Sequence, residues 1–252
     1  MLTGKRLLEI CIDGVASARA AAAGGADRVE LCANLPEGGT TPSAGMIAGT
    51  RRAFSGALMV IIRPRGYDFL FSADEMNVML GDIRTARDLG ADGVVIGCLR
   101  SDGTVDEEAC ARLVEAAGPL DITFHRAFDM TRDLPEAMEA IVRLGIRRIL
   151  TSGGRPDAGG GAEVIASLVR QAAGRVSLMP GGGLSPANIA EIVGRTGARE
   201  AHLSARGPVV SGMVFRNPGC SMGTFSAADE YAWRQSDPDV VAAARAALDA
   251  LP

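Results

Sequence analysis

The chain has 252 residues, 47% of them hydrophobic, and a formal net charge of −4 at pH 7. This length is typical of a single α/β barrel, and the weakly acidic charge argues against nucleic acid as a partner. No stretch approaches the roughly 18 apolar residues of a membrane span, and the first residues lead directly into a charged strand instead of a signal peptide. We therefore expect no membrane partner.

Strands and helices alternate along the whole chain. We predict strands at residues 7–12, 28–32, 57–64, 93–98, 120–125, 146–152, 176–181 and 199–205. We predict helices at residues 15–23, 43–54, 73–89, 106–117, 134–144, 161–173, 186–195 and 238–250. Ser43, Ser72 and the pair Ser185-Pro186 mark helix starts. Because the strands are apolar runs, the pattern predicts a (β/α)8 TIM-type barrel that forms a single domain over residues 1–252. An open doubly wound sheet is the alternative.

A short internal repeat stands near the start, where LLEIC at 7–11 is matched by RVELC at 28–32. Side chains alternate between the two faces of a strand, so Glu9 shares a face with Cys11, and Glu30 shares a face with Cys32. If the two strands are parallel neighbours, two carboxylates and two thiols cluster. The two cysteines then either pack as small apolar residues or bind a soft metal ion such as copper(I).

Further polar side chains follow the ends of later strands, which is where TIM barrels carry their active sites. The predicted mouth cluster supplies acid/base groups and anion-binding groups. Its members are Glu9, Glu30, Arg63, His125, Arg126 and His202. The alternative is structural: the glutamates pair with Arg63 or Arg126 inside the barrel, and the histidines fill the core.

A second set of residues is suited to an anion. Gly181, Gly182 and Gly183 form a loop that opens a helix after the seventh strand, a common place for phosphate in this fold. We expect Arg65 and Ser152 to contribute to the same site, with ion pairing to the glutamates as the alternative role of the arginine. The long connection over 204–236 is predicted to be a lid or a binding segment.

Five scattered cysteines, an odd number, indicate reduced thiols and a cytoplasmic location. The chain has only two histidines, which argues against a zinc site built from several imidazoles. We expect a homodimer, because twofold dimers are the commonest assembly.

Several runs together resemble the CutC copper-homeostasis family over essentially the whole chain. They are LLEIC, ADRVELC, IIRPRG, TFHRAFD, RILTSG and GGGLSPANI. The resemblance implies a TIM-type barrel, a cytoplasmic location and, as in some members, copper(I) binding by two cysteines that match Cys11 and Cys32. It also implies a polar cluster at the barrel mouth that matches the six residues named above.

Two functions compete. The first is copper(I) binding for copper homeostasis. The second is an enzyme that acts on a small anionic metabolite, phosphorylated or carboxylated, at the barrel mouth. A scaffold without chemistry is a third interpretation, and the buried charges make it costly.

Overall fold

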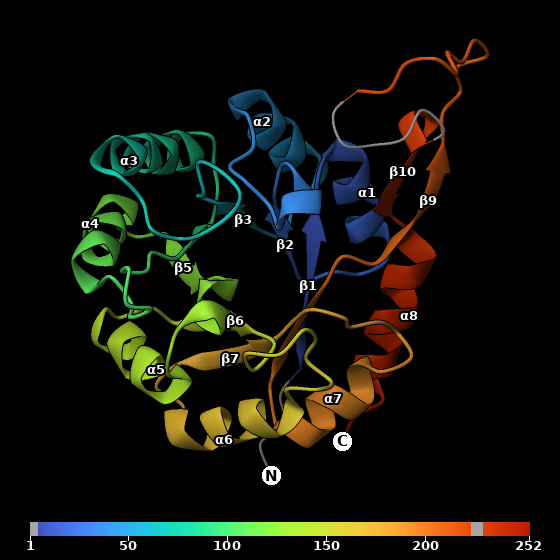
Figure 1. Ribbon diagram of the computed structural model, residues 1–252. Coiled ribbons are helices and arrows are strands. Elements are labelled where there is room, and N and C mark those ends of the chain that lie inside the picture. The colour runs from blue at the N-terminus through green and yellow to red at the C-terminus, as the bar shows by residue number, and fades with distance from the viewer. Residues whose placement is uncertain (1–4, 223–228) are drawn as a thin grey trace.

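A computed structural model describes residues 5–222 and 229–252. Eight parallel strands form a ring, and the helices surround it (Figure 1). The ring strands are β1 (Leu7–Ile12), β2 (Arg28–Leu31), β3 (Ala57–Ile61), β4 (Gly93–Ile96), β5 (Asp121–Phe124), β6 (Arg148–Thr151), β7 (Ser177–Pro180) and β8 (Glu200–Leu203). The helices are α1 (Val15–Ala23), α2 (Ala44–Ala53), α3 (Ala73–Asp88), α4 (Glu107–Ala117), α5 (Leu134–Arg143), α6 (Ala162–Ala172), α7 (Ile189–Thr196) and α8 (Pro238–Asp249). Short 3-10 helices cover Leu35–Glu37, Arg126–Met130 and Asp229–Tyr231.

The strand order confirms the predicted barrel. Neighbouring strands pair in the order β7-β6-β5-β4-β3-β2-β1-β8, and a parallel bridge between Gly181 and His202 joins the two ends. The ring is therefore nearly closed. None of the helices in the described part of the chain is long and apolar enough to cross a membrane.

The side chains of β1 alternate between two environments, the apolar core under the helices and the interior of the ring. Leu8, Ile10 and Ile12 are fully buried in the large apolar core that the ring shares with its helices. Glu9 and Cys11 lie on the opposite face, inside the ring, and both are buried. The barrel interior therefore receives the polar half of the strand pattern.

Two of the three predicted helix starts are confirmed. Ser43 and Ser72 accept backbone N–H groups from the first turns of α2 and α3. The start at Ser185 is wrong, because α7 begins at Ile189. Residues 186–188 form a turn, in which the Ser185 amide donates to Asn188 Oδ1 over 2.8 Å.

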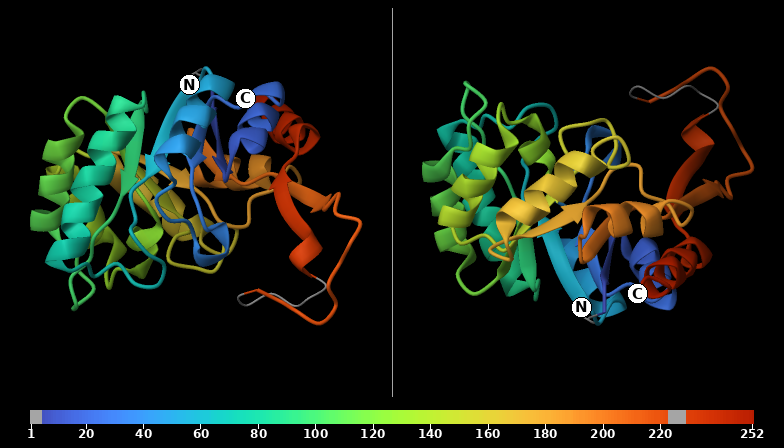
Figure 2. Two further views of the ribbon diagram at one scale, coloured as in Figure 1. Left: turned by 90° about the horizontal axis from the view of Figure 1, so that it is seen from above. Right: turned by 90° about the horizontal axis from the view of Figure 1, so that it is seen from below.

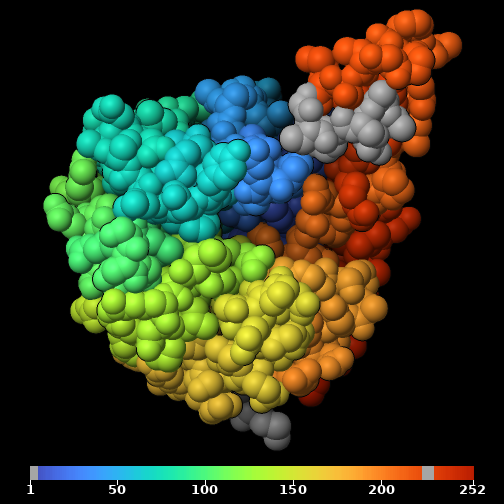
Figure 3. Space-filling view, in the orientation of Figure 1, coloured from blue at the N-terminus to red at the C-terminus, as the bar shows by residue number. Residues whose placement is uncertain are grey.

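The segment over 204–236 contains a hairpin that the sequence analysis missed. Strands β9 (Arg206–Val210) and β10 (Ala232–Ser236) pair in antiparallel fashion. Its base is anchored on α1, where the Ser236 amide donates to Ser17 Oγ. We call the described residues within 206–236 the arm. The arm projects from the barrel in all views (Figures 2 and 3).

Candidate functional site

The carboxyl ends of the strands open into a cavity of about 490 Å³. Five of the six predicted mouth residues line this cavity, together with both repeat cysteines. They are Glu30, Arg63, His125, Arg126, His202, Cys11 and Cys32. Glu9 does not line the cavity. It lies opposite His202 in the pairing of β1 with β8. The chain thus gathers the predicted residues at one rim of the barrel, where chemistry is common in this fold.

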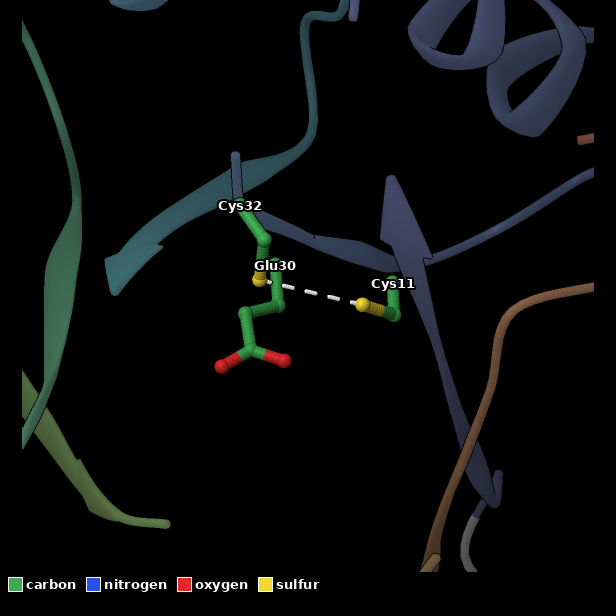
Figure 4. A group of neighbouring side chains, drawn as sticks. All are labelled: Cys11, Glu30 and Cys32. Atoms are coloured by element: carbon green, nitrogen blue, oxygen red, sulfur yellow. Dashed lines mark hydrogen bonds between the residues drawn. The ribbon is translucent and has the colours of Figure 1, made fainter. Parts of the chain in front are cut away.

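The register of β1 and β2 places the two thiols together. Cys11 stands opposite Glu30, and Cys32 follows the last residue of β2, where its amide donates to the Ile12 carbonyl. The two Sγ atoms are 3.8 Å apart (Figure 4). These sulfurs and one Glu30 carboxylate oxygen all lie within 4.8 Å of one another. The group offers two soft donors and one hard donor to a metal ion.

His202 lies between two carboxylates. Its Nδ1 is 2.7 Å from Glu9 Oε1, and its Nε2 is 3.7 Å from Glu30 Oε2. Burial opposes the charged imidazolium, but hydrogen bonds with Cys11 and Glu9 raise the pKa of His202 well above its usual value. Burial likewise opposes ionisation of Glu9, and the charge of Arg28 with the His202 hydrogen bond lowers its pKa below the ordinary range.

The same neighbours shift the pKa values of the two thiols in opposite directions. The hydrogen bond from Cys32, acting against burial, and a further hydrogen bond with His202 lower the pKa of Cys11 to about 6. The Cys11 hydrogen bond and burial raise the pKa of Cys32 well above its usual value. Burial and the Cys11 charge raise the pKa of Glu30. At neutral pH the site therefore holds the Cys11 thiolate next to the protonated Cys32 thiol, beside a Glu30 carboxyl whose ionisation is opposed by burial and by the Cys11 charge.

A buried ionic network supports the site from below. Arg28 donates to Glu9 and to Glu200, and Arg148 donates to Glu200 and to Asp121. Glu9 therefore pairs with Arg28 and His202, and the suggested pairing with Arg63 or Arg126 is wrong. Sequence reasoning missed both network arginines. The available signal was alternation, since Arg28 shares the inward face of β2 with Glu30.

Arg63 and His125 form a second wall of the cavity. Arg63 donates to the backbone carbonyls of Glu37, Gly39 and Tyr67, and its guanidinium lies 4.8 Å from the Phe69 ring centroid. Within the described residues it has no carboxylate partner at ion-pair distance. Burial and the Arg63 charge lower the pKa of His125 to about 3, so its imidazole is neutral.

The predicted anion-binding residues do not form one group. Arg65 pairs with Glu75 and Asp68 outside the cavity. Ser152 is fully buried and bonded to Asp129, which also pairs with Arg126. Gly181 donates to the Thr151 carbonyl within the ring. Only Gly182 and Gly183 of this set line the cavity.

Comparison with known proteins places the chain in a family. The CutC family model matches residues 6–207. A CutC family protein from Mesorhizobium japonicum is 49% identical over 244 residues, covering 97% of this chain and 95% of that protein. The human copper homeostasis protein cutC homolog is 47% identical over 231 residues, covering 92% of this chain and 85% of that protein.

Solved structures agree with this placement. The crystal structure of CutC from Streptococcus agalactiae superposes with a TM-score of 0.76 at 34% identity, covering 79% of this chain and 98% of that chain. Thiamine phosphate pyrophosphorylase from Pyrococcus furiosus, at 18% identity and a TM-score of 0.59, covers 96% of this chain and 95% of its own, and it shares the fold alone. The chain belongs to the CutC family.

Proposed function

We propose that this chain binds one copper(I) ion between Cys11 and Cys32 and acts in copper homeostasis. The observation that carries this proposal is the pair of sulfurs 3.8 Å apart, one of which has a pKa lowered to about 6. Thiolates favour copper(I) over harder ions. Zinc–thiolate bonds are about 2.3 Å long, so two sulfurs separated by less than about 4.6 Å can bind one ion of similar size.

The surroundings suit a monovalent soft cation. The Cys11 thiolate supplies a negative charge, and the Glu30 carboxyl offers a third donor beside the sulfurs. Full coordination by both sulfurs removes the remaining proton from Cys32. Binding therefore releases a proton, and affinity rises with pH. The human relative carries copper homeostasis in its name, which supports the same assignment.

We also place the chain in a reducing compartment, the cytoplasm. All five cysteines are free, including Cys11 and Cys32, whose sulfurs lie 3.8 Å apart. A disulfide brings two sulfurs to about 2.05 Å and would consume both of the sulfur donors proposed here. Reduced thiols are the rule in the cytoplasm.

An anaerobic titration of copper(I) against a competing chromogenic chelator tests the proposal. Wild-type protein is expected to take one ion per chain, and the double variant C11A/C32A is expected to lose that binding. The matched control is C98A/C110A, which removes the other neighbouring pair of buried cysteines. Equal copper binding by C11A/C32A and wild type contradicts the proposal.

A second function, an enzyme that acts on a small anionic metabolite, is favoured by a different observation. The cavity of about 490 Å³ is far larger than a metal ion needs, and it reaches the Arg63 guanidinium, which has no carboxylate partner in the described part of the chain. In this function Arg63 binds a carboxylate or phosphate group. Glu30, whose pKa is raised, is the proton donor at the other wall.

Native mass spectrometry of gently purified protein tests this second function. We expect a small anion that stays with wild type and with R65Q but is lost from R63Q. Arg65 is the matched control because it lies two residues away and is paired outside the cavity. A wild-type mass equal to that of the bare chain counts against the enzyme and leaves the copper proposal intact.

A further inference from the structure

The two thiols belong to a larger group of donor atoms that includes an imidazole. The neighbouring strands β8, β1 and β2 bring this group to one cavity, and its members are Cys11, Glu30, Cys32 and His202. His202 forms a hydrogen bond with Cys11, and its Nε2 is 3.7 Å from Glu30 Oε2. The cavity wall therefore presents two sulfurs, one nitrogen and one carboxylate oxygen side by side.

Glu9 fixes the orientation of the His202 ring. Its Oε1 atom is 2.7 Å from His202 Nδ1, and Arg28 donates to the other Glu9 oxygen. Histidines that bind metal ions almost always pair their second ring nitrogen with a carboxylate or a carbonyl, which fixes the ring and the tautomer. Because Glu9 occupies Nδ1, Nε2 is the nitrogen left to coordinate an ion, and it lies on the side of Glu30.

The spacing of the two sulfurs fits a tetrahedral ion. With zinc–sulfur bonds of about 2.3 Å, sulfurs that lie 3.8 Å apart enclose an angle of about 110° at the ion, which is close to the tetrahedral angle. Tetrahedral coordination leaves two further positions. Zinc accepts cysteine, histidine and carboxylate ligands, and His202 and Glu30 are the donors beside the sulfurs.

Charge also favours a divalent ion at this place. Ligands lose their protons when a metal ion binds, so two thiolates and the Glu30 carboxylate put three negative charges into a buried group. A divalent ion compensates two of these charges, whereas a monovalent ion compensates only one. Since uncompensated charge is costly in the interior, the complete set of ligands suits a divalent ion.

We propose that the two thiols, together with His202 and Glu30, form a four-coordinate zinc(II) site, so that the chain binds zinc(II) in addition to copper(I). The site needs a single imidazole, which a chain with two histidines can supply. All four ligands line the cavity, which gives the ion a path of entry. The two metals share the cysteines, but the zinc site does not depend on copper binding.

Competition for zinc(II) between a chromogenic chelator and the metal-free, reduced protein tests the site. We expect wild type to bind one ion per chain. Loss of even an outer partner of a metal ligand costs about 10–100-fold in affinity, so we expect H202Q to bind zinc at least about 100-fold more weakly. The matched control is H125Q, which removes the other histidine of the chain from the same cavity and is expected to bind as wild type does.

No zinc binding by wild type, or equal affinities of wild type and H202Q, overturns the proposal. Circular dichroism verifies that each variant is folded. Should H202Q fail to fold, E30Q takes its place and is expected to weaken zinc binding by at least about tenfold. Its control is E37Q, which changes another carboxylate of the cavity wall and is expected to leave the affinity unchanged.

Cobalt(II) in place of zinc reports the ligands by absorption. We expect a sulfur-to-cobalt charge-transfer band and the intense visible bands of four-coordinate cobalt in wild type, and we expect C11A/C32A to lose the charge-transfer band. A weak, six-coordinate spectrum without that band overturns the proposal. Copper is used in neither test, so the two proposals fail separately: a chain that binds copper(I) but not zinc(II) contradicts this inference and leaves the copper proposal intact.

Discussion

Replacing Arg28 by methionine tests whether the ionic network holds the site together. Arg28 is only 5% exposed and donates to both Glu9 and Glu200, so its loss leaves two buried carboxylates each short of one partner. Breaking a buried ion pair from one side typically costs about 3–5 kcal/mol. Each carboxylate keeps another partner, His202 for Glu9 and Arg148 for Glu200, so we expect the lower end, about 3 kcal/mol.

Thermal and chemical unfolding measure this loss. For a chain of this size, about 3 kcal/mol corresponds to a decrease in Tm of about 6–12 °C. The control is R175M. Arg175 also donates hydrogen bonds to a carboxylate, that of Glu139, but it does so at the surface, where water replaces the lost partner. We expect R175M to change stability little. If R28M lowers the free energy of unfolding no more than R175M does, the network does not support the barrel interior as described.

Three other predictions concern the site. Alkylation of Cys11 in metal-free protein, followed by peptide mass spectrometry, is expected to reach half its maximal rate near pH 6, and H202Q is expected to move this midpoint upward; an unchanged midpoint refutes the role of the imidazolium. The folded-state pKa of Glu9 lies below its ordinary value of 4.5, so Glu9 stabilises the fold above that pH and loses this effect as the pH falls through the folded value. Urea unfolding should therefore show a shallower loss of stability in acid for E9Q than for wild type, and parallel curves contradict the assignment. A methyl group at Gly39, where φ is +94°, would lie 3.2 Å from Cys32 Sγ. We expect G39A to cost about 1–2 kcal/mol and to weaken copper(I) binding, whereas G118A, with positive φ and open space, should leave copper binding unchanged; equal copper affinities would show that the thiol spacing is not critical.

The fold was predictable because each ring strand is an apolar run followed by a helical segment. The repeat at Glu9 and Glu30 also predicted that thiols and carboxylates share the barrel interior, and the register of β1 with β2 shows them there. Helix starts were less certain. Ser185-Pro186 has the composition of a helix start, yet Asn188 captures the Ser185 amide and delays α7.

Side-chain partners could not be predicted from strand order alone. Arg63 and Arg65 look equivalent in the sequence, but one lies in the cavity wall on backbone carbonyls and the other pairs with Glu75. The difference depends on how the connection after β3 folds back, and the local sequence does not predict this path. The arm was missed for a related reason, because its strands bury little and their residues resemble those of a loop.

The site couples two neighbouring thiols, of which only Cys11 has a lowered pKa, to the His202 imidazole and to an ionic network at the base of the barrel. The protonation states in the site depend on burial as much as on charge. Residues other than the two cysteines therefore control the fraction of each thiol that is ionised. This arrangement brings two thiols and a carboxyl together in the interior of a chain that has only two histidines.

X-ray absorption at the copper edge of the anaerobic copper(I)-loaded protein tests the central claim most directly. We predict a first coordination shell that contains two sulfur atoms per copper, which disappears in C11A/C32A and persists in C98A/C110A. A shell of nitrogen and oxygen alone in the wild-type protein would contradict the claim that Cys11 and Cys32 share one ion.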